Sequence, residues 1–149
     1  MEVRPLAERG GSRVMVVVFA SGDEAVGGLE RVARDESVRA ASFTAIGTFE
    51  RAVLGYFDWE RKDYRRIQVD EQVEVVSLTG NIAALPDGSP KIHAHAVLGT
   101  SEGAARCGHV LSGLVRPTLE VILQESPTSL SRRHDPATGL ALIDAGASG

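Results

Sequence analysis

Hydrophobic residues in this chain occur mostly in short runs or in alternation with polar residues, which is typical of β-strands. The clearest run lies in residues 13–19, where every residue from Val14 to Phe19 is apolar. Such a β-branched run suits a strand that is buried on both faces. Shorter segments of the same kind follow at 40–49, 52–58, 64–69, 73–82, 91–98 and 119–123. The pattern therefore predicts about seven strands.

One segment has the helical period instead. Ser21 and Glu24 have the spacing of a capping box, which marks a helix start. One side of the following three turns is apolar and consists of Val26, Leu29, Val32 and Ala33. Gly27 and Gly28 lie inside this helix, although each glycine costs roughly 0.5–1 kcal/mol relative to alanine. Close packing of the helix on a sheet would explain them. One helix beside about seven strands predicts an α+β fold with a largely antiparallel sheet.

The two ends of the chain have weaker patterns. We expect residues 1–12 to form a flexible leader, residues 13–144 to form one domain, and residues 145–149 to be a disordered tail. Near the end, residues 132–136 are polar and predict a loop, and the apolar residues 140–143 predict one more short strand.

Composition and charge limit the classes of function that this protein can have. The 149 residues include 20 acidic and 16 basic side chains, for a net charge of −4, which argues against a broad duplex-binding surface but not against a local basic patch. No apolar run approaches the roughly 18 residues of a membrane helix, so we expect no membrane contact. The lone Cys107 cannot form an intrachain disulfide, and the first residues have no apolar signal segment. We therefore expect a cytoplasmic protein.

Three of the four histidines lie close together in the sequence and suggest a metal site. His93 and His95 are two residues apart in a predicted strand, so both project from the same face. A turn around residues 101–103 can bring His109 back beside them. Neutral imidazoles bind divalent transition metals, zinc above all, and three of them leave a coordination position open for water or a small anionic ligand. The alternative is that the three are hydrogen-bonded strand and core histidines.

Two further polar residues are candidates to orient the histidines through their second ring nitrogen. Asn81 and Glu120 could do so, but Asn81 could equally bind a turn backbone, and Glu120 could pair across a subunit interface. Cys107 precedes His109 by two residues and could share its face, although a free cysteine is more often a small buried apolar residue. His134 we expect to lie on a surface loop.

Several short segments occur in an order that resembles the PPC (plants-and-prokaryotes-conserved) domain family. They are TAIG at 44–47, LGYFD at 54–58, EVVSLTGNI at 74–82, DGSP at 87–90, HAHAVL at 93–98, GHVL at 108–111 and TLEV at 118–121. The resemblance covers about residues 13–144. It implies one main helix against an antiparallel sheet, assembly as a homotrimer, and three shared histidines, here His93, His95 and His109, placed near one another.

The sequence leaves three functions open. The leading hypothesis is a homotrimeric, metal-binding PPC-like module with a ligand-binding or regulatory role, in which the trimer would cover the apolar strands 52–57 and 119–123. The second is a DNA-associated regulator, as the resemblance to plant members with AT-hooks implies, although this chain has no Arg-Gly-Arg-Pro core. The third is a metal-dependent hydrolase or lyase acting on a small polar substrate, with Glu120 as its acid or base.

Overall fold

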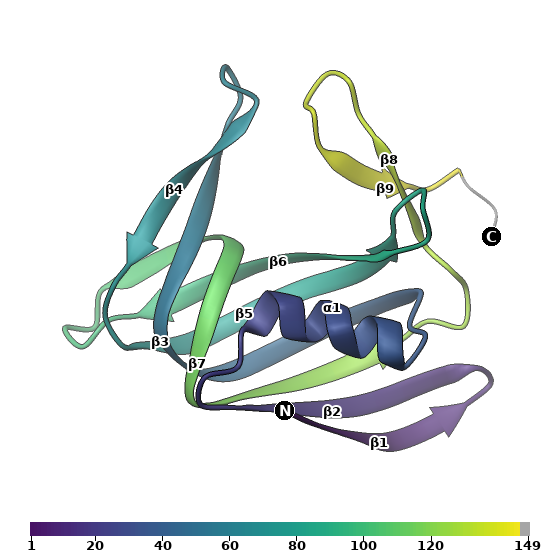
Figure 1. The fold of residues 1–149 in the computed structure, drawn as a ribbon, viewed down its shortest axis with the longest axis horizontal. Helices are drawn as coiled ribbons and strands as arrows, with labels where there is room; N and C mark the ends of the chain where they lie inside the picture. The colour runs from purple at the N-terminus through teal and green to yellow at the C-terminus, as the bar shows by residue number, and fades with distance from the viewer. Residues whose placement is uncertain (147–149) are drawn as a thin grey trace.

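A computed structural model describes residues 1–146, which form nine strands and one helix, α1 (Ala25–Asp35) (Figure 1). The strands are β1 (Glu2–Arg9), β2 (Ser12–Ala20), β3 (Ala40–Asp58), β4 (Asp63–Val69), β5 (Val73–Ala84), β6 (Pro90–Gly99), β7 (Ala105–Glu125), β8 (Ser131–His134) and β9 (Ala141–Asp144). The prediction of a mostly β-sheet protein with one helix is therefore confirmed, whereas the count of about seven strands was too low.

All nine strands belong to one sheet, in which β7 is the central element. Strand β7 is 21 residues long and pairs antiparallel with β2, β3 and β6 along different parts of its length. Strand β5 pairs with β3 and β6, and β4 pairs with β3. The one parallel contact described is between β5 and β8. The hairpins β3–β4 and β8–β9 project from the same side of the sheet and face each other across a gap (Figure 1).

Helix α1 packs on the sheet through its apolar side. Its N-cap is Glu24, whose carboxylate accepts hydrogen bonds from the backbone N–H groups of Val26 and Gly27. The helix thus begins later than the capping-box pattern at Ser21 predicted, because Ser21 and Gly22 form a turn first. A Cβ on Gly28 would lie 2.3 Å from Cε1 of the fully buried Phe19. Close packing on the sheet therefore explains this glycine.

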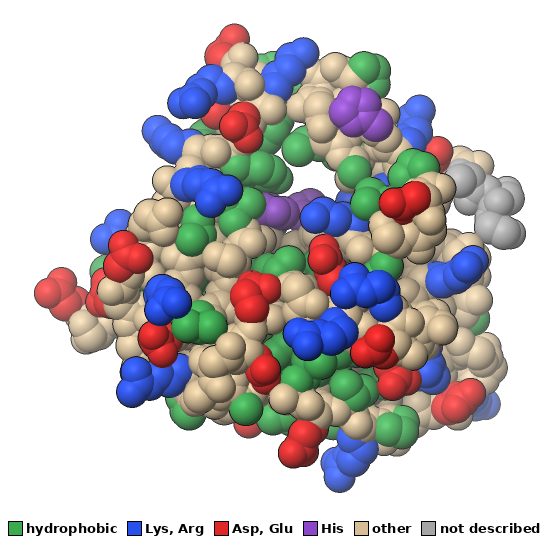
Figure 2. All heavy atoms as spheres, viewed as in Figure 1, with side chains coloured by type: hydrophobic (Ala, Val, Ile, Leu, Met, Phe, Trp, Pro, Cys, Tyr) green, Lys and Arg blue, Asp and Glu red, His purple; other side chains and the backbone are tan. Residues whose placement is uncertain are grey.

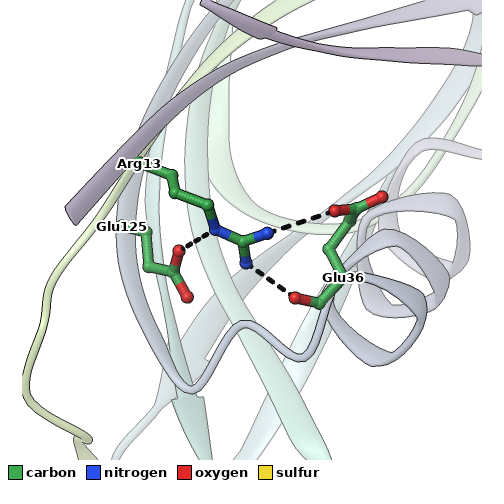
Figure 3. Close-up of polar contacts among 3 residues, drawn as sticks. All are labelled: Arg13, Glu36 and Glu125. Carbon is green, nitrogen blue, oxygen red and sulfur yellow. Dashed lines mark hydrogen bonds and ion pairs between the residues drawn. The ribbon is translucent and has the colours of Figure 1, made fainter. Parts of the chain in front are cut away.

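The core lies between the helix and the inner face of the sheet. Its largest fully buried side chains include Phe19, Phe49, Leu54, Leu119 and Leu123. At one edge of this core, Arg13 connects three parts of the chain (Figure 3). Its Nε donates to the Glu125 carboxylate at the end of β7, and its Nη2 donates to the backbone carbonyl of Glu36, 2.6 Å away, just after the helix. The ion pair with Glu125 is partly buried.

The extra strands are at the two ends of the chain, where the hydrophobic signal is weakest. Strand β1 lies within residues 1–12, where a flexible leader was expected, and forms a hairpin with β2. Almost all of its side chains are exposed, so it has no apolar alternation to reveal it. Strand β8 occupies residues predicted to be a polar loop, and it pairs with β9, which coincides with the predicted short strand. Strands β1 and β8 form because they pair with other strands, and such pairing is not visible in the local sequence.

The separate predicted segments 40–49 and 52–58 are one strand, β3, with irregular register against β7. Likewise, the predicted segment 119–123 is the last part of β7. The expected disordered tail, 145–149, lies outside the described residues except for Ala145 and Gly146, which form a turn. Helix α1, the helix of the described part of the chain, lacks the length and apolar content of a membrane span.

Candidate metal centre

Strand alternation and strand pairing together bring the three histidines to one place. In β6, Ile92, Ala94 and Ala96 point into the core, so His93 and His95 project from the opposite face. Strand β7 runs antiparallel to β6, and its His109 is the direct cross-strand partner of His95. The three imidazoles therefore meet on the outer side of the sheet.

The spacing of His93 and His95 matches a tetrahedral metal ion, and His109 lies near both. The Nε2 atoms of His93 and His95 are 3.3 Å apart, and one ligand atom from each of the three histidines lies within 4.8 Å of the other two. Zinc–nitrogen bonds of about 2.0–2.1 Å at tetrahedral angles separate two ligand nitrogens by about 3.3–3.4 Å. In addition, Nδ1 of His109 is buried and has no hydrogen-bond partner among the described residues. These residues could hold a divalent transition metal.

Burial keeps two of these imidazoles neutral. It lowers the pKa of His93, and it lowers the pKa of His109 to about 4, with the neighbouring imidazoles, Lys91 and Arg132 acting in the same direction. A histidine must be deprotonated at one ring nitrogen to bind a metal. At neutral pH no proton therefore has to be removed from His109 before it can act as a ligand.

Neighbouring residues hold the histidines in place. The ring of Tyr64, on β4, stacks on His109 with 4.6 Å between ring centroids and an interplanar angle of 21°. Next to His93, Gly80 of β5 lies so close to β6 that a Cβ there would be 2.6 Å from the backbone oxygen of His93. Strands β4 and β5 thus restrict where the imidazoles can move.

A cavity of about 130 Å³ opens beside His93 and His109. Its other lining residues are Tyr64, Lys91, Ile92, Arg132, Leu140, Ala141 and Leu142. Figure 2 shows histidine side chains at the base of the hollow between the β3–β4 and β8–β9 hairpins. No carboxylate is among the lining residues described, and two of them are cations. The candidate centre is therefore reachable by a small molecule and has positively charged surroundings.

The other candidate residues occupy different positions. Asn81 is the cross-strand partner of His93, but its side-chain oxygen accepts a hydrogen bond from Nη2 of Arg132. Glu120 lines a separate hollow with Ile46 and Val76 and does not line the cavity. Cys107 is exposed and is not part of the histidine cluster.

Two residues of the cavity were missed by the sequence reasoning. Arg132 was assigned to a polar loop, and its side chain is instead buried beside the histidines. For Tyr64, the sequence predicts only a place in the strand at 64–69. The turn-forming Asp-Pro-Ala-Thr-Gly segment at 135–139 could have indicated the β8–β9 hairpin, but nothing in the local sequence indicates that Arg132 is buried. Nothing local distinguished Tyr64.

The fold and the three histidines define a sheet domain with a candidate imidazole centre. A comparison with known families identifies the class of domain. The family model of the Plants and Prokaryotes Conserved (PCC) domain, also abbreviated PPC, matches residues 6–127. The chain belongs to this family, and the resemblance predicted from sequence is confirmed. A comparison with curated proteins found no match.

Several solved structures are similar to this chain over nearly their whole length. The plant- and prokaryote-conserved protein of Pyrococcus horikoshii is 30% identical, with a TM-score of 0.84, and the match covers 95% of this chain and 99% of that one. A metal-containing protein of Archaeoglobus fulgidus is 31% identical, with a TM-score of 0.80 and coverage of 88% and 92%. A protein of Ralstonia eutropha JMP134, provisionally named as DNA-binding, is 31% identical, with a TM-score of 0.81 and coverage of 87% and 90%.

Proposed function

We propose that this PPC domain is a cytoplasmic, homotrimeric ligand-binding or regulatory module that holds a divalent transition metal, zinc first, through His93, His95 and His109. The observation that carries the proposal is the convergence of three imidazoles, with one ligand atom of each within 4.8 Å of the other two, beside an accessible cavity. The Archaeoglobus fulgidus relative, which is described as metal-containing, supports it. Three protein ligands leave a coordination position open, and the cationic cavity beside it suits a small anion.

Metal binding by the untagged protein tests this proposal. Protein purified without a histidine tag should contain close to one zinc per chain by elemental analysis, or take up one zinc per chain by calorimetric titration. His95→Ala should weaken zinc affinity by at least about 100-fold, because a two-histidine site is incomplete. His134→Ala is the matched control, since His134 is exposed at the end of β8. Equal zinc binding by the wild type and His95→Ala would refute the site.

A ligand-binding role has more support than a catalytic one. A hydrolase or lyase needs an acid or base within hydrogen-bond reach of the reacting group. Glu120, the nominee for that role, lies in another hollow, and the cavity lining has no carboxylate among the residues described. The arrangement thus provides a place for a ligand, whereas Glu120, the acid or base of the catalytic alternative, lies elsewhere.

The trimer is supported by exposed apolar residues on the outer face of the sheet, which we call the outer patch. The outer patch consists of Val18, Ile46, Val76, Val97 and Ile122. Ile46 and Val76 are 62% and 60% exposed, which is unusual for neighbouring large apolar side chains. Glu120 shares their hollow, so it would lie at such an interface.

Sedimentation analysis would test the assembly. The wild type should have the mass of three 15.8-kDa chains, and Ile46→Asp should dissociate it, because an unpaired carboxylate would be buried in the interface. Leu6→Asp, at an exposed position of β1, is a control that should leave the mass unchanged. A monomeric wild type would exclude the trimer.

DNA association is the second candidate, and the name of the Ralstonia eutropha relative is the observation that favours it. A net charge of −4 opposes it, because duplex binding depends on basic side chains that displace counterions. Electrophoretic mobility of duplex DNA at low salt tests it. A shift that disappears as salt rises would support DNA association, and unchanged mobility would exclude it.

A further inference from the structure

The cavity beside the histidines contains a buried cation with an unused donor. Arg132 is only 5% exposed. Its Nη1 donates to the backbone carbonyl of Ala141 at 3.0 Å, and its Nη2 donates to the side-chain oxygen of Asn81. Its Nε is buried and has no partner among the described residues. A buried guanidinium whose described hydrogen bonds go to neutral oxygens is costly, so an anion in the adjoining cavity would stabilise it.

The rest of the polar lining adds positive charge. Lys91 stands at the same cavity, and its nearest acid is Glu30, 3.6 Å away on the helix. Both Lys91 and Arg132 are close enough to His109 to lower its pKa by charge repulsion. No acid lines the cavity within residues 1–146, so a bound anion would meet Arg132, whose described partners are neutral oxygens, and Lys91, whose ion-pair partner Glu30 lies outside the lining.

Part of the cavity lining is apolar, and we call it the apolar wall. It is formed by Ile92 of β6 and by Leu140, Ala141 and Leu142 of the β8–β9 hairpin. The cavity volume of about 130 Å³ is close to that of a protein cavity that holds one benzene molecule, roughly 150 Å³. A ligand of roughly six non-hydrogen atoms therefore fits, with a charged end toward Arg132 and a short carbon chain against the wall.

The hairpin that supplies these groups is held in a defined position. Its turn is closed by hydrogen bonds to the Asp135 carboxylate from the backbone N–H of Thr138 at 3.1 Å and from the Thr138 hydroxyl at 2.6 Å. The hairpin is joined to β5 by the backbone bond from Ala84 N–H to the carbonyl of Leu130, at 2.8 Å. The family match ends at residue 127, so Arg132 and the wall residues of the β8–β9 hairpin lie beyond it.

We infer that Arg132 and the apolar wall of the β8–β9 hairpin select a small monocarboxylate with a short carbon chain as the ligand of this cavity. The inference deepens the proposed function and rests on it for the metal beside the cavity. A carboxylate matches the planar donor fork of a guanidinium. An apolar wall favours a carbon chain over an inorganic anion, which would leave that wall without a partner.

Calorimetric titration of sodium butyrate into the zinc-loaded protein tests the inference. Butyrate has the required six non-hydrogen atoms. Arg132→Gln should weaken butyrate binding at least tenfold without abolishing zinc binding, because the three histidines of the cluster remain in place. Arg133→Gln is the matched control, since the neighbouring Arg133 side chain is 75% exposed and does not line the cavity. It should bind butyrate like the wild type.

Ligand variation tests the two ends of the cavity separately. Butyramide, a neutral analogue of the same size, should not bind measurably, because it cannot pair with Arg132. Acetate should bind about tenfold more weakly than butyrate, because it lacks two methylene groups that the wall would bury. Leu142→Asp, at a 42% exposed position of the wall, should abolish butyrate binding without unfolding the protein. This variant keeps the test decisive if Arg132→Gln fails to fold.

The outcomes separate this inference from the proposed function. Zinc binding with equal butyrate affinity in the wild type and Arg132→Gln would overturn the inference and leave the metal site intact. Inorganic phosphate binding more tightly than butyrate would overturn the choice of a carboxylate. Butyrate binding that depends on Arg132 in a protein that takes up no zinc would support the anion subsite and refute the metal site. A protein that binds neither zinc nor butyrate would refute both the metal site and the anion subsite.

Discussion

Replacing Gly80 by alanine should displace the strand that carries His93 and thereby weaken metal binding at the candidate metal centre. Gly80 lies in β5, opposite Ala94 of β6. A Cβ added there would lie 2.4 Å from Cζ of Phe43, 2.6 Å from the backbone oxygen of His93 and 3.0 Å from Cβ of Ala94. Phe43 is only 2% exposed, and the oxygen of His93 belongs to the strand backbone. Neither can move alone, so the added methyl group would push β6 away from β5.

The size of the effect follows from two opposing terms. Forcing an extra carbon into a well-packed region costs about 1–3 kcal/mol. Alanine in a strand recovers roughly 0.5–1 kcal/mol relative to glycine. The difference is roughly 0–2.5 kcal/mol. Because two of the contacts are far below 3.0 Å, we expect Gly80→Ala to lower the free energy of unfolding by about 1–2 kcal/mol. Because His93 lies on the displaced backbone, zinc affinity should also fall by about 10–100-fold, the range typical of losing a group that supports a metal ligand.

Urea unfolding and zinc titration measure the two effects, with Gly28→Ala as the matched control. Its Cβ would lie 2.3 Å from Phe19, so it should also destabilise the protein, but it is on the helix, away from the histidines. Zinc affinity of folded Gly28→Ala should equal that of the wild type. If Gly80→Ala were as stable as the wild type, the packing argument would be refuted. If Gly80→Ala and Gly28→Ala bound zinc equally well, the link to His93 would be refuted.

Three further predictions concern stability and the single cysteine. Arg13→Gln should lower the free energy of unfolding by about 1–2 kcal/mol in urea titrations, because it removes the charged contacts with Glu125 and Glu36 (Figure 3); an unchanged unfolding midpoint would contradict this. The metal-free protein should lose thermal stability as the pH falls from about 6.5 toward 4, since the unfolded chain takes up a proton at His109 before the folded protein does. His109→Asn should flatten that part of the profile, and an equally steep profile would show that other groups cause it. Cys107→Ser should keep the zinc affinity of the wild type, because Cys107 is exposed and outside the histidine cluster; a tenfold loss in titration would make it a ligand.

Local patterns were sufficient to place the histidines. Alternation in residues 91–98 puts His93 and His95 on one face, since successive side chains of a strand point in opposite directions. The turn after this strand returns the chain antiparallel, which brings His109 opposite His95. All three positions thus depend on one hairpin, β6–β7, whose register is set by residues that are near in sequence. The same holds for the helix, whose apolar side faces the core as its period predicts.

The surroundings of the histidines depend on contacts between distant segments. Arg132 is buried because β8 joins the sheet beside β5, and Asn81, in the middle of β5, receives its guanidinium. A run of polar residues with no periodicity gives no indication of such burial. Tyr64 reaches His109 only because β4 folds back on β3, next to β7. The sequence by itself therefore determined the family, through its ordered motifs, and the mostly β-sheet fold and the meeting of the three imidazoles, which depend on short-range alternation and turns. Only the tertiary structure decided which cation and which apolar wall stand beside them, because packing between segments far apart in the chain creates that cavity.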